Sequence, residues 1–128
     1  MARKKSSTLT EAELRLMEVL WDMGRATVAE VTEQLPPPPL AYNTVLTTMR
    51  ILEQKGYVRH KEDGRAYVYE PLIARDDAAN SAVGTILQRF FGNKSGALAL
   101  RLVEDHRPTD EELQRLKRLI AEYEEKGS

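Results

Sequence analysis

The first apolar residues of the chain recur at intervals of one, three and four, as on one face of a helix. They are Leu14, Met17, Leu20 and Trp21. Thr10 and Glu13 stand before them in the order of a capping box, in which each side chain accepts a hydrogen bond from the other residue's amide. Gly24 ends the pattern. A first helix is therefore predicted from about Thr10 to Gly24.

The same features predict a second, shorter helix. Thr27 and Glu30 repeat the capping box, and apolar residues follow at Val28, Val31 and Leu35. Four prolines, Pro36 to Pro39, end this helix because proline lacks the amide hydrogen that a helix interior needs. We interpret the prolines as a stiff connector between two helices rather than as a ligand for a proline-binding domain.

A third helix is predicted from Ala41 to Lys55, ended by Gly56. One side is apolar and should pack on the first two helices; it holds Tyr42, Val45, Leu46, Met49 and Leu52. Another side is polar and holds Asn43, Thr47, Arg50 and Gln54, with Thr44 and Thr48 adjoining. Taken alone, such a polar side is explained as a solvated surface.

A hairpin is predicted from Tyr57 to Tyr69, turning at Asp63-Gly64, a dipeptide typical of the type I′ turn. The expected pairs are Glu62 with Arg65, His60 with Tyr67, and Val58 with Tyr69. Alternation places His60 beside the tyrosines, where packing explains it better than metal binding. The other face carries Arg59, Lys61, Ala66 and Val68.

Three helices and a basic hairpin predict a winged helix-turn-helix, which lays its third helix in the DNA major groove and its hairpin on phosphates. The whole chain has a net charge of −1, but residues 40–69 hold five basic against three acidic residues. Such a local excess favours phosphate binding. The candidate DNA contacts from this pattern are Asn43, Thr47, Arg50, Arg59, Lys61 and Arg65.

Beyond Pro71 the pattern predicts three more helices. The first runs from about Arg75 to Phe91, the second is capped by Ser95, and the third begins at the capping box of Thr109 and Glu112. About 50 residues are too few to cover so much apolar surface unaided. We therefore expect a homodimer, although these helices could instead fold back on the first domain within a monomer. The expected interface holds Ala82, Ile86, Phe90, Phe91, Leu102, Leu113, Leu116, Ile120 and Tyr123.

Composition argues against several other classes of protein. The chain has no cysteine, no glycine-rich phosphate loop, and only His60 and His106 as histidines. No catalytic site, metal site or cofactor is therefore expected. The sequence contains no pattern typical of a signal peptide and no apolar run long enough to span a membrane. A cytoplasmic protein without membrane insertion is predicted.

Five segments resemble the penicillinase repressors, the BlaI/MecI/CopY family. They are Leu9–Glu13, Ala41–Thr48, Leu52–Gly56, Gly64–Pro71 and Phe90–Gly92. The resemblance extends from about Leu9 to Tyr123. It implies a dimeric winged-helix repressor with a C-terminal helical dimerisation domain, bound to palindromic operators that commonly contain TACA and TGTA halves.

The resemblance also implies particular contacts and a regulatory partner. It assigns DNA contacts to Asn43, Thr44, Thr47 and Thr48 in the third helix and to Arg65 and Tyr67 in the wing. Copper-responsive members carry paired cysteines that this chain lacks. β-Lactam-responsive members are cut by a membrane sensor-protease at an Asn-Phe bond, and the matching position here is Arg101-Leu102. A regulatory protease is thus a candidate partner, but the inducer stays open.

The sequence therefore predicts a mostly α protein with a small β-hairpin wing. Its expected parts are a flexible basic tail over residues 1–8, a winged-helix DNA-binding domain over 9–72 and a helical dimerisation domain over 73–128. The expected function is sequence-specific transcriptional repression by a homodimer. The alternative is a winged helix that serves as a protein–protein adaptor, for which an exposed apolar patch would be expected on the third helix.

Overall fold

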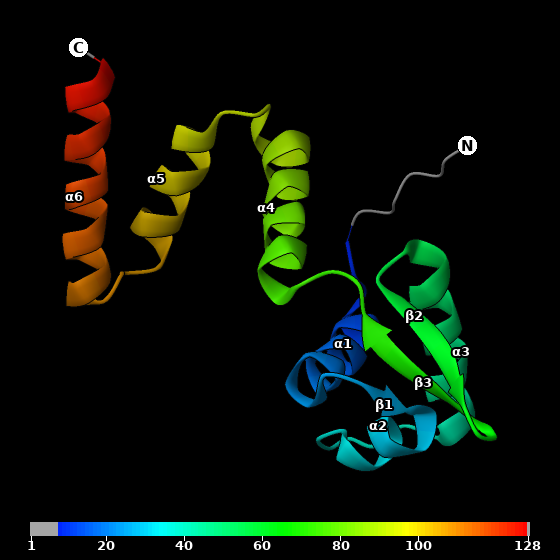
Figure 1. Ribbon diagram of the computed structural model, residues 1–128. Coiled ribbons are helices and arrows are strands. Elements are labelled where there is room, and N and C mark those ends of the chain that lie inside the picture. Colours follow the sequence, from blue (N-terminus) through cyan, green and yellow to red (C-terminus); the bar gives the residue numbers. More distant parts are fainter. Residues whose placement is uncertain (1–7, 128) are drawn as a thin grey trace. The chain divides into compact units, whose positions relative to one another are not determined.

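The computed structural model describes residues 8–127 and places six helices and three strands in them (Figure 1). The helices are α1 (Glu11–Met23), α2 (Val28–Gln34), α3 (Tyr42–Lys55), α4 (Arg75–Phe91), α5 (Ser95–Asp105) and α6 (Asp110–Gly127). The strands are β1 (Ala26–Thr27), β2 (Val58–Asp63) and β3 (Ala66–Pro71). The predicted mostly α fold with a small wing is confirmed. Except for Thr8, the predicted basic tail lies outside the described residues.

The chain divides into two compact units, with the boundary between Ile86 and Leu87, inside α4. The first unit, which we call the head, contains α1, α2, α3, the sheet and the larger part of α4. The second contains the end of α4 together with α5 and α6.

The core of the head is built from α1, α2, α3 and the sheet. Its fully buried side chains include Leu16, Met17, Leu20, Val31, Val45, Met49, Leu52, Val58 and Tyr69. Two predictions about this core were wrong. Leu14 is 40% exposed, because α1 turns Leu16 and Val19 inward instead, and Tyr42 is 51% exposed at the first turn of α3.

The predicted helix boundaries follow from the caps. Both capping boxes of the head are present: the Glu13 amide donates to the Thr10 hydroxyl over 3.1 Å, and the Thr27–Glu30 pair repeats the arrangement. The Glu13 carboxylate is buried and also accepts from Lys55 Nζ over 2.7 Å, which ties the start of α1 to the end of α3. Arg15 donates to the carbonyls of Pro36 and Pro38 and so holds the proline connector against α1.

The sheet has the strand order β1-β3-β2 and is antiparallel throughout. Strand β1 was not predicted; it pairs Ala26 with Tyr69 and Thr27 with Val68. A two-residue strand is too short to show an alternating pattern, and its partner lies more than forty positions away. The wing is therefore a three-stranded sheet fixed to the N-terminal end of α2.

The predicted hairpin register was also wrong. The observed pairs are Asp63 with Ala66, Glu62 with Tyr67, Lys61 with Val68, His60 with Tyr69, Arg59 with Glu70, and Val58 with Pro71. The loop is Gly64-Arg65, and only Gly64 has a positive φ, as expected for a type II′ turn rather than type I′. The shift of two positions leaves every side chain on its predicted face, because alternation has period two.

The helices that follow the sheet, α4, α5 and α6, are exposed along their length. Helix α4 ends as predicted at Gly92 and Asn93, both with positive φ, and the Thr109–Glu112 capping box opens α6. Ser95 is the first helical residue of α5 rather than its cap, which is Lys94 without a side-chain hydrogen bond. Between residues 75 and 127, none of the side chains of α4, α5 and α6 is buried. Within residues 8–127, no helix is both long enough and apolar enough to span a membrane.

Candidate DNA interface

The outer side of α3 carries a row of exposed polar side chains, which we call the α3 stripe: Asn43, Thr47, Arg50 and Gln54. At 3.6 residues per turn these positions fall within about 60° of one another. Thr44 and Ile51 are exposed beside the stripe. Thr48 is only 9% exposed, and its hydroxyl donates to the Thr44 carbonyl over 2.8 Å, so Thr48 lies outside this surface.

Packing fixes the stripe in position. Val45, Met49 and Leu52, on the opposite side of α3, are fully buried among the residues of α1 and α2. Gly56 then ends the helix in the left-handed region, with φ of 88°, and turns the chain into the wing. The stripe is therefore held on a rigid element, as base recognition in a groove requires.

One face of the wing is joined to α3. His60 Nδ1 lies 2.8 Å from the Glu53 carboxylate, and its ring stacks on Tyr67 at 4.3 Å between centroids. The Tyr69 ring follows at 5.5 Å and is buried. The prediction that His60 packs against tyrosines is confirmed. Glu53, which orients the wing on α3, was missed; it lies on a third side of α3, between the apolar side and the stripe.

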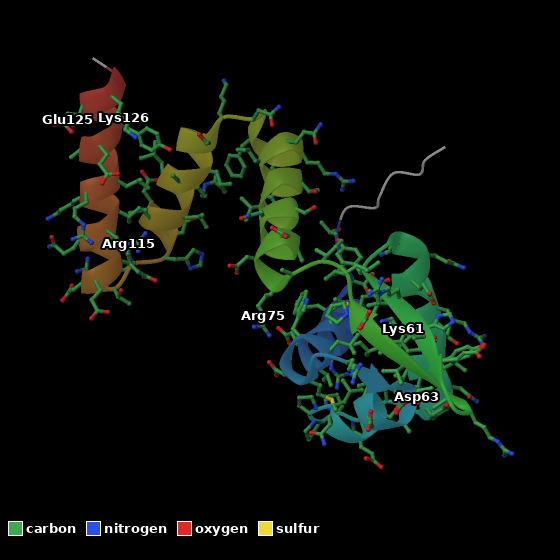
Figure 2. All side chains as sticks on the ribbon, viewed as in Figure 1. Lys61, Asp63, Arg75, Arg115, Glu125 and Lys126 are labelled. Atoms are coloured by element: carbon green, nitrogen blue, oxygen red, sulfur yellow. The ribbon has the colours of Figure 1, made fainter. Side chains whose placement is uncertain are left out.

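The predicted basic residues of the wing fall into two groups. Arg59 pairs with the Glu70 carboxylate, and Lys61 Nζ lies 3.7 Å from the same group. The Arg59 hydrogen bond holds the pKa of Glu70 below its usual range. Both cations project from the face opposite His60, where Lys61 lines a cavity with Arg25 and other side chains. They thus lie on the strand face opposite the one that contacts α3 through His60. Figure 2 labels Lys61 on this wing.

Arg65 and Tyr67 form the second group, on the side of α3. Arg65 is exposed in the turn, and no described residue forms an ion pair with it within 4.0 Å. Tyr67 is 46% exposed and, with Arg65, lines a cavity that Tyr42 and Leu46 of α3 also line. The structure therefore places Arg65 and Tyr67 next to Tyr42 and Leu46 of α3, which precede Asn43 and Thr47 in the chain, and it places Arg59 and Lys61 on the other face of the wing.

The buried Tyr69 phenol gives the head a pH dependence. Burial and the nearby Glu53 carboxylate raise its pKa above 10.0. The neutral phenol is thus favoured in the folded head, and its contribution to stability is lost as the pH rises from the unfolded pKa through the folded one. We expect Tyr69→Phe to reduce the loss of thermal stability between pH ~9 and pH ~11, measured by circular dichroism.

The matched control is Tyr123→Phe, which removes the same hydroxyl from a residue that is exposed on α6. It should leave the alkaline loss as in the unaltered chain. Equal alkaline losses for Tyr69→Phe and Tyr123→Phe would show that the Tyr69 phenol does not contribute.

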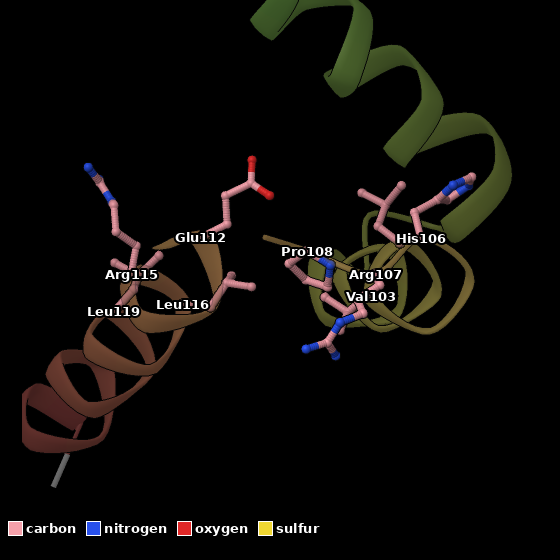
Figure 3. A pocket seen from close by; sticks show the side chains of 9 residues that line it. Val103, His106, Arg107, Pro108, Glu112, Arg115, Leu116 and Leu119 are labelled. Carbon is pink, nitrogen blue, oxygen red and sulfur yellow. The ribbon is translucent and has the colours of Figure 1, made fainter. Parts of the chain in front are cut away.

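The apolar side chains predicted to form a dimer interface are accessible in the single chain. The most exposed are Phe90, Tyr123, Ile120 and Leu102, and Phe90 reaches 76%. A groove of about 660 Å³ runs between α5 and α6 and is lined mostly by apolar side chains, among them Leu113, Leu116 and Ile120. A second cavity, of about 550 Å³, lies where the two helices connect, with His106, Glu112 and Arg115 at its polar side (Figure 3).

Among residues 8–127, no cluster of three or more histidine or acidic side chains has the arrangement of a metal site. Arg101, the first residue of the pair that matches the cleaved bond of some relatives, lies within α5. Its guanidinium is 5.8 Å from the Phe91 ring centre.

The sequence of the whole chain identifies its relatives. The sequence model of the family described as penicillinase repressor matches residues 9–122, which include the head and nearly all of the second unit. The chain belongs to the penicillinase repressor family. The resemblance given by its sequence motifs is confirmed, and the family is one of transcriptional repressors rather than enzymes.

Two relatives illustrate how far the similarity extends. The chain is 27% identical to the penicillinase repressor of Bacillus licheniformis, over 94% of both chains. It is 32% identical to the transcriptional regulator BlaI of Mycobacterium tuberculosis, over 94% of this chain and 88% of that one. The predicted function as a repressor of this family is thereby confirmed.

A solved structure supports the fold of the head. The solution structure of the DNA-binding domain of the repressor BlaI is 32% identical to this chain, with a TM-score of 0.52. The match covers 59% of this chain and 93% of that domain. The winged helix-turn-helix is therefore confirmed.

Proposed function

We propose that the protein represses transcription as a homodimer on a palindromic DNA operator, with one α3 stripe in the major groove of each half-site. The observation that carries this proposal is the exposed α3 stripe on a helix whose adjoining side, at Tyr42 and Leu46, lines one cavity with Arg65 and Tyr67 of the wing. The dimer bound to its operator would exclude RNA polymerase from an overlapping promoter. A cytoplasmic location suits this role.

The stripe would read bases and the wing would hold the backbone. An asparagine side chain can donate to and accept from one adenine edge, and a threonine can bond an edge and place its methyl on that of thymine. Arg50 suits a guanine edge or a phosphate. Thr44 lies beside the stripe and would extend it, whereas Thr48 would act indirectly by holding the backbone of Thr44.

The second unit would supply the dimer. Its groove between α5 and α6 is apolar, and solvent-exposed apolar surfaces of this kind mark sites of protein association. Two heads held together would read two half-sites about one helical turn apart. Relief of repression would follow from anything that separates the heads, including a protease that cuts near Arg101-Leu102.

The wing offers a direct test of this function. We expect Arg65→Ala to reduce the slope of log K against log salt concentration by about 1 per head, because a cation bound to a phosphate releases its counterions. Arg59→Ala should change this slope much less, because Arg59 is paired with Glu70 on the other face of the wing. Fluorescence anisotropy titrations of an operator duplex at several salt concentrations measure both slopes.

Arg59→Ala is the matched control, since it removes the same kind of side chain from the same wing. Equal slopes for Arg65→Ala and the unaltered chain would show that Arg65 does not contact a phosphate. A larger effect of Arg59→Ala than of Arg65→Ala would place the DNA on the opposite face of the wing.

A further inference from the structure

A cavity of about 440 Å³ opens in the head between the wing, the start of α2 and the start of α3. Its lining includes the apolar residues Val28 and Leu46 and the buried Tyr69. It also includes two half-exposed rings, Tyr42 from α3 and Tyr67 from β3. The cavity therefore has apolar and aromatic side chains in its lining, and they come from separate elements of the head.

Tyr42 has no role in the core. The helical pattern predicted that it packs on α1 and α2, but it is 51% exposed. It begins α3, so its side chain lies beside the position where Asn43 starts the stripe. A large aromatic side chain kept half exposed next to a binding surface commonly serves in binding, because the ring adds apolar contact while its hydroxyl remains available.

The polar groups at this cavity suit an anion next to an apolar group. Arg65 lines it from the turn of the wing, and no described carboxylate neutralises it within 4.0 Å. Tyr69 also lines the cavity, and burial raises the pKa of its phenol, which therefore stays neutral. The lining residues Tyr42 and Tyr67 carry hydroxyls as well, and tyrosine hydroxyls act as donors at neutral pH. The lining thus combines a cation, hydroxyl-bearing side chains and aromatic rings.

We propose that this cavity receives a sugar–phosphate unit of the bound DNA strand, with Tyr42 and Tyr67 against the deoxyribose and Arg65 paired with the phosphate. Tyr42 is then a backbone contact that sets the register of α3 in the groove. Phosphate and sugar contacts fix orientation without carrying base information. The cavity adjoins the stripe, because around α3 Leu46 lies about 40° from Arg50 and about 60° from Asn43, so a strand that follows the stripe would reach it. This inference rests on the proposed function.

The test compares Tyr42→Ala, Tyr42→Phe and Asn43→Ala in the full chain. Tyr42→Ala should weaken binding to an operator duplex and to a random duplex by a similar factor, about 3- to 20-fold, because Tyr42 does not touch a base. The salt slope should stay unchanged, because tyrosine carries no charge at neutral pH. Asn43→Ala should weaken operator binding alone. Tyr42→Phe should retain most of the affinity, since the ring remains.

Ethylation interference supplies an independent readout. In the unaltered chain, ethylation of one phosphate in each half-site should block binding, and this block should weaken in both Tyr42→Ala and Arg65→Ala. Leu14→Ala is the control, because Leu14 is 40% exposed on α1 and lies outside the cavity lining. It should match the unaltered chain in affinity and footprint, and the thermal midpoints of all variants report whether the head is folded.

Three results would overturn the inference. Unchanged affinity in Tyr42→Ala, with Asn43→Ala still weakened, would remove Tyr42 from the DNA and leave the proposed function intact. A loss in Tyr42→Ala confined to the operator would make Tyr42 a base contact. An unchanged phosphate footprint in both Tyr42→Ala and Arg65→Ala would show that the cavity does not bind the DNA backbone, and a free small molecule would then be its ligand. If Asn43→Ala also binds normally, the proposed function itself fails.

Discussion

Ile120→Asp is expected to convert the protein into monomers that bind operator DNA about 10²- to 10⁴-fold more weakly. Ile120 is 56% exposed in the single chain, so an aspartate there costs little in the protomer. In a dimer that covers the α5–α6 groove, the same aspartate would be a buried and unpaired charge. Loss of the second head removes the effective-concentration advantage of paired binding, which accounts for the size of the effect.

Light scattering gives the mass of the variant, and an operator titration gives its affinity. Gln114→Asp is the matched control, because it adds the same charge to an exposed position of α6 that lies about 100° or more around the helix from the apolar groove side chains Leu113, Leu116 and Ile120. It should remain dimeric and bind as the unaltered chain does. A dimeric Ile120→Asp would place the interface on another surface.

Asn43→Ala is expected to weaken operator binding about 10- to 100-fold per half-site, the cost of removing one bidentate hydrogen-bonded pair between a side chain and a base. Asn43 is exposed at the start of α3 and supports no described packing, so the stability of the head should change by no more than about 0.5 kcal/mol. Affinity for random DNA should stay nearly constant, because that binding depends on phosphates.

Anisotropy titrations on operator and random duplexes measure this ratio directly. Gln114→Ala on α6 is the control, since it removes an exposed amide from the other unit. If Asn43→Ala lowers affinity for both duplexes equally, Asn43 contacts the backbone and the base reading must come from Thr47, Arg50 or their neighbours.

Much of the head could be predicted from the sequence because its signals are local. The capping boxes at Thr10 and Thr27, the prolines and Gly56 each act over a few residues, and they fixed the helix ends to within about one position. The stripe followed from helical periodicity. Arg65 and Tyr67 lie on the α3 side of the wing despite the wrong register, because a shift of two positions preserves the faces of a strand.

The errors concern features that depend on tertiary contacts. Strand β1 exists through pairing with β3, and the type of the hairpin turn depends on which residue next to Gly64 enters the loop. The helical periodicity of the sequence divided α3 into an apolar and a polar side only. It therefore predicted that Tyr42 lies in the core, and it gave Glu53 no role. A third side faces the wing, and its position could be found only once the hairpin was placed against the helix.

The pairing of Arg59 and Lys61 with Glu70 was equally beyond the sequence, although alternation already put both cations on the face opposite His60. A count of basic residues treats Arg59, Lys61 and Arg65 alike. Arg59 and Lys61 lie on one face of β2, and Glu70 lies opposite Arg59 on β3. The Glu70 carboxylate already pairs with both cations, whereas Arg65 has no such partner among the described residues. Local net charge therefore indicated a DNA-binding head but did not indicate which cations are available to DNA.

The central claim is that a dimer of this chain reads a two-fold symmetric DNA sequence through α3. Selection of bound duplexes from a random-sequence library, with an excess of unlabelled random DNA as competitor, tests it most directly. The account predicts enrichment of a palindrome whose half-sites lie about one helical turn apart, and loss of that enrichment in Asn43→Ala. Recovery of duplexes with no common sequence, bound only at low salt, would contradict it.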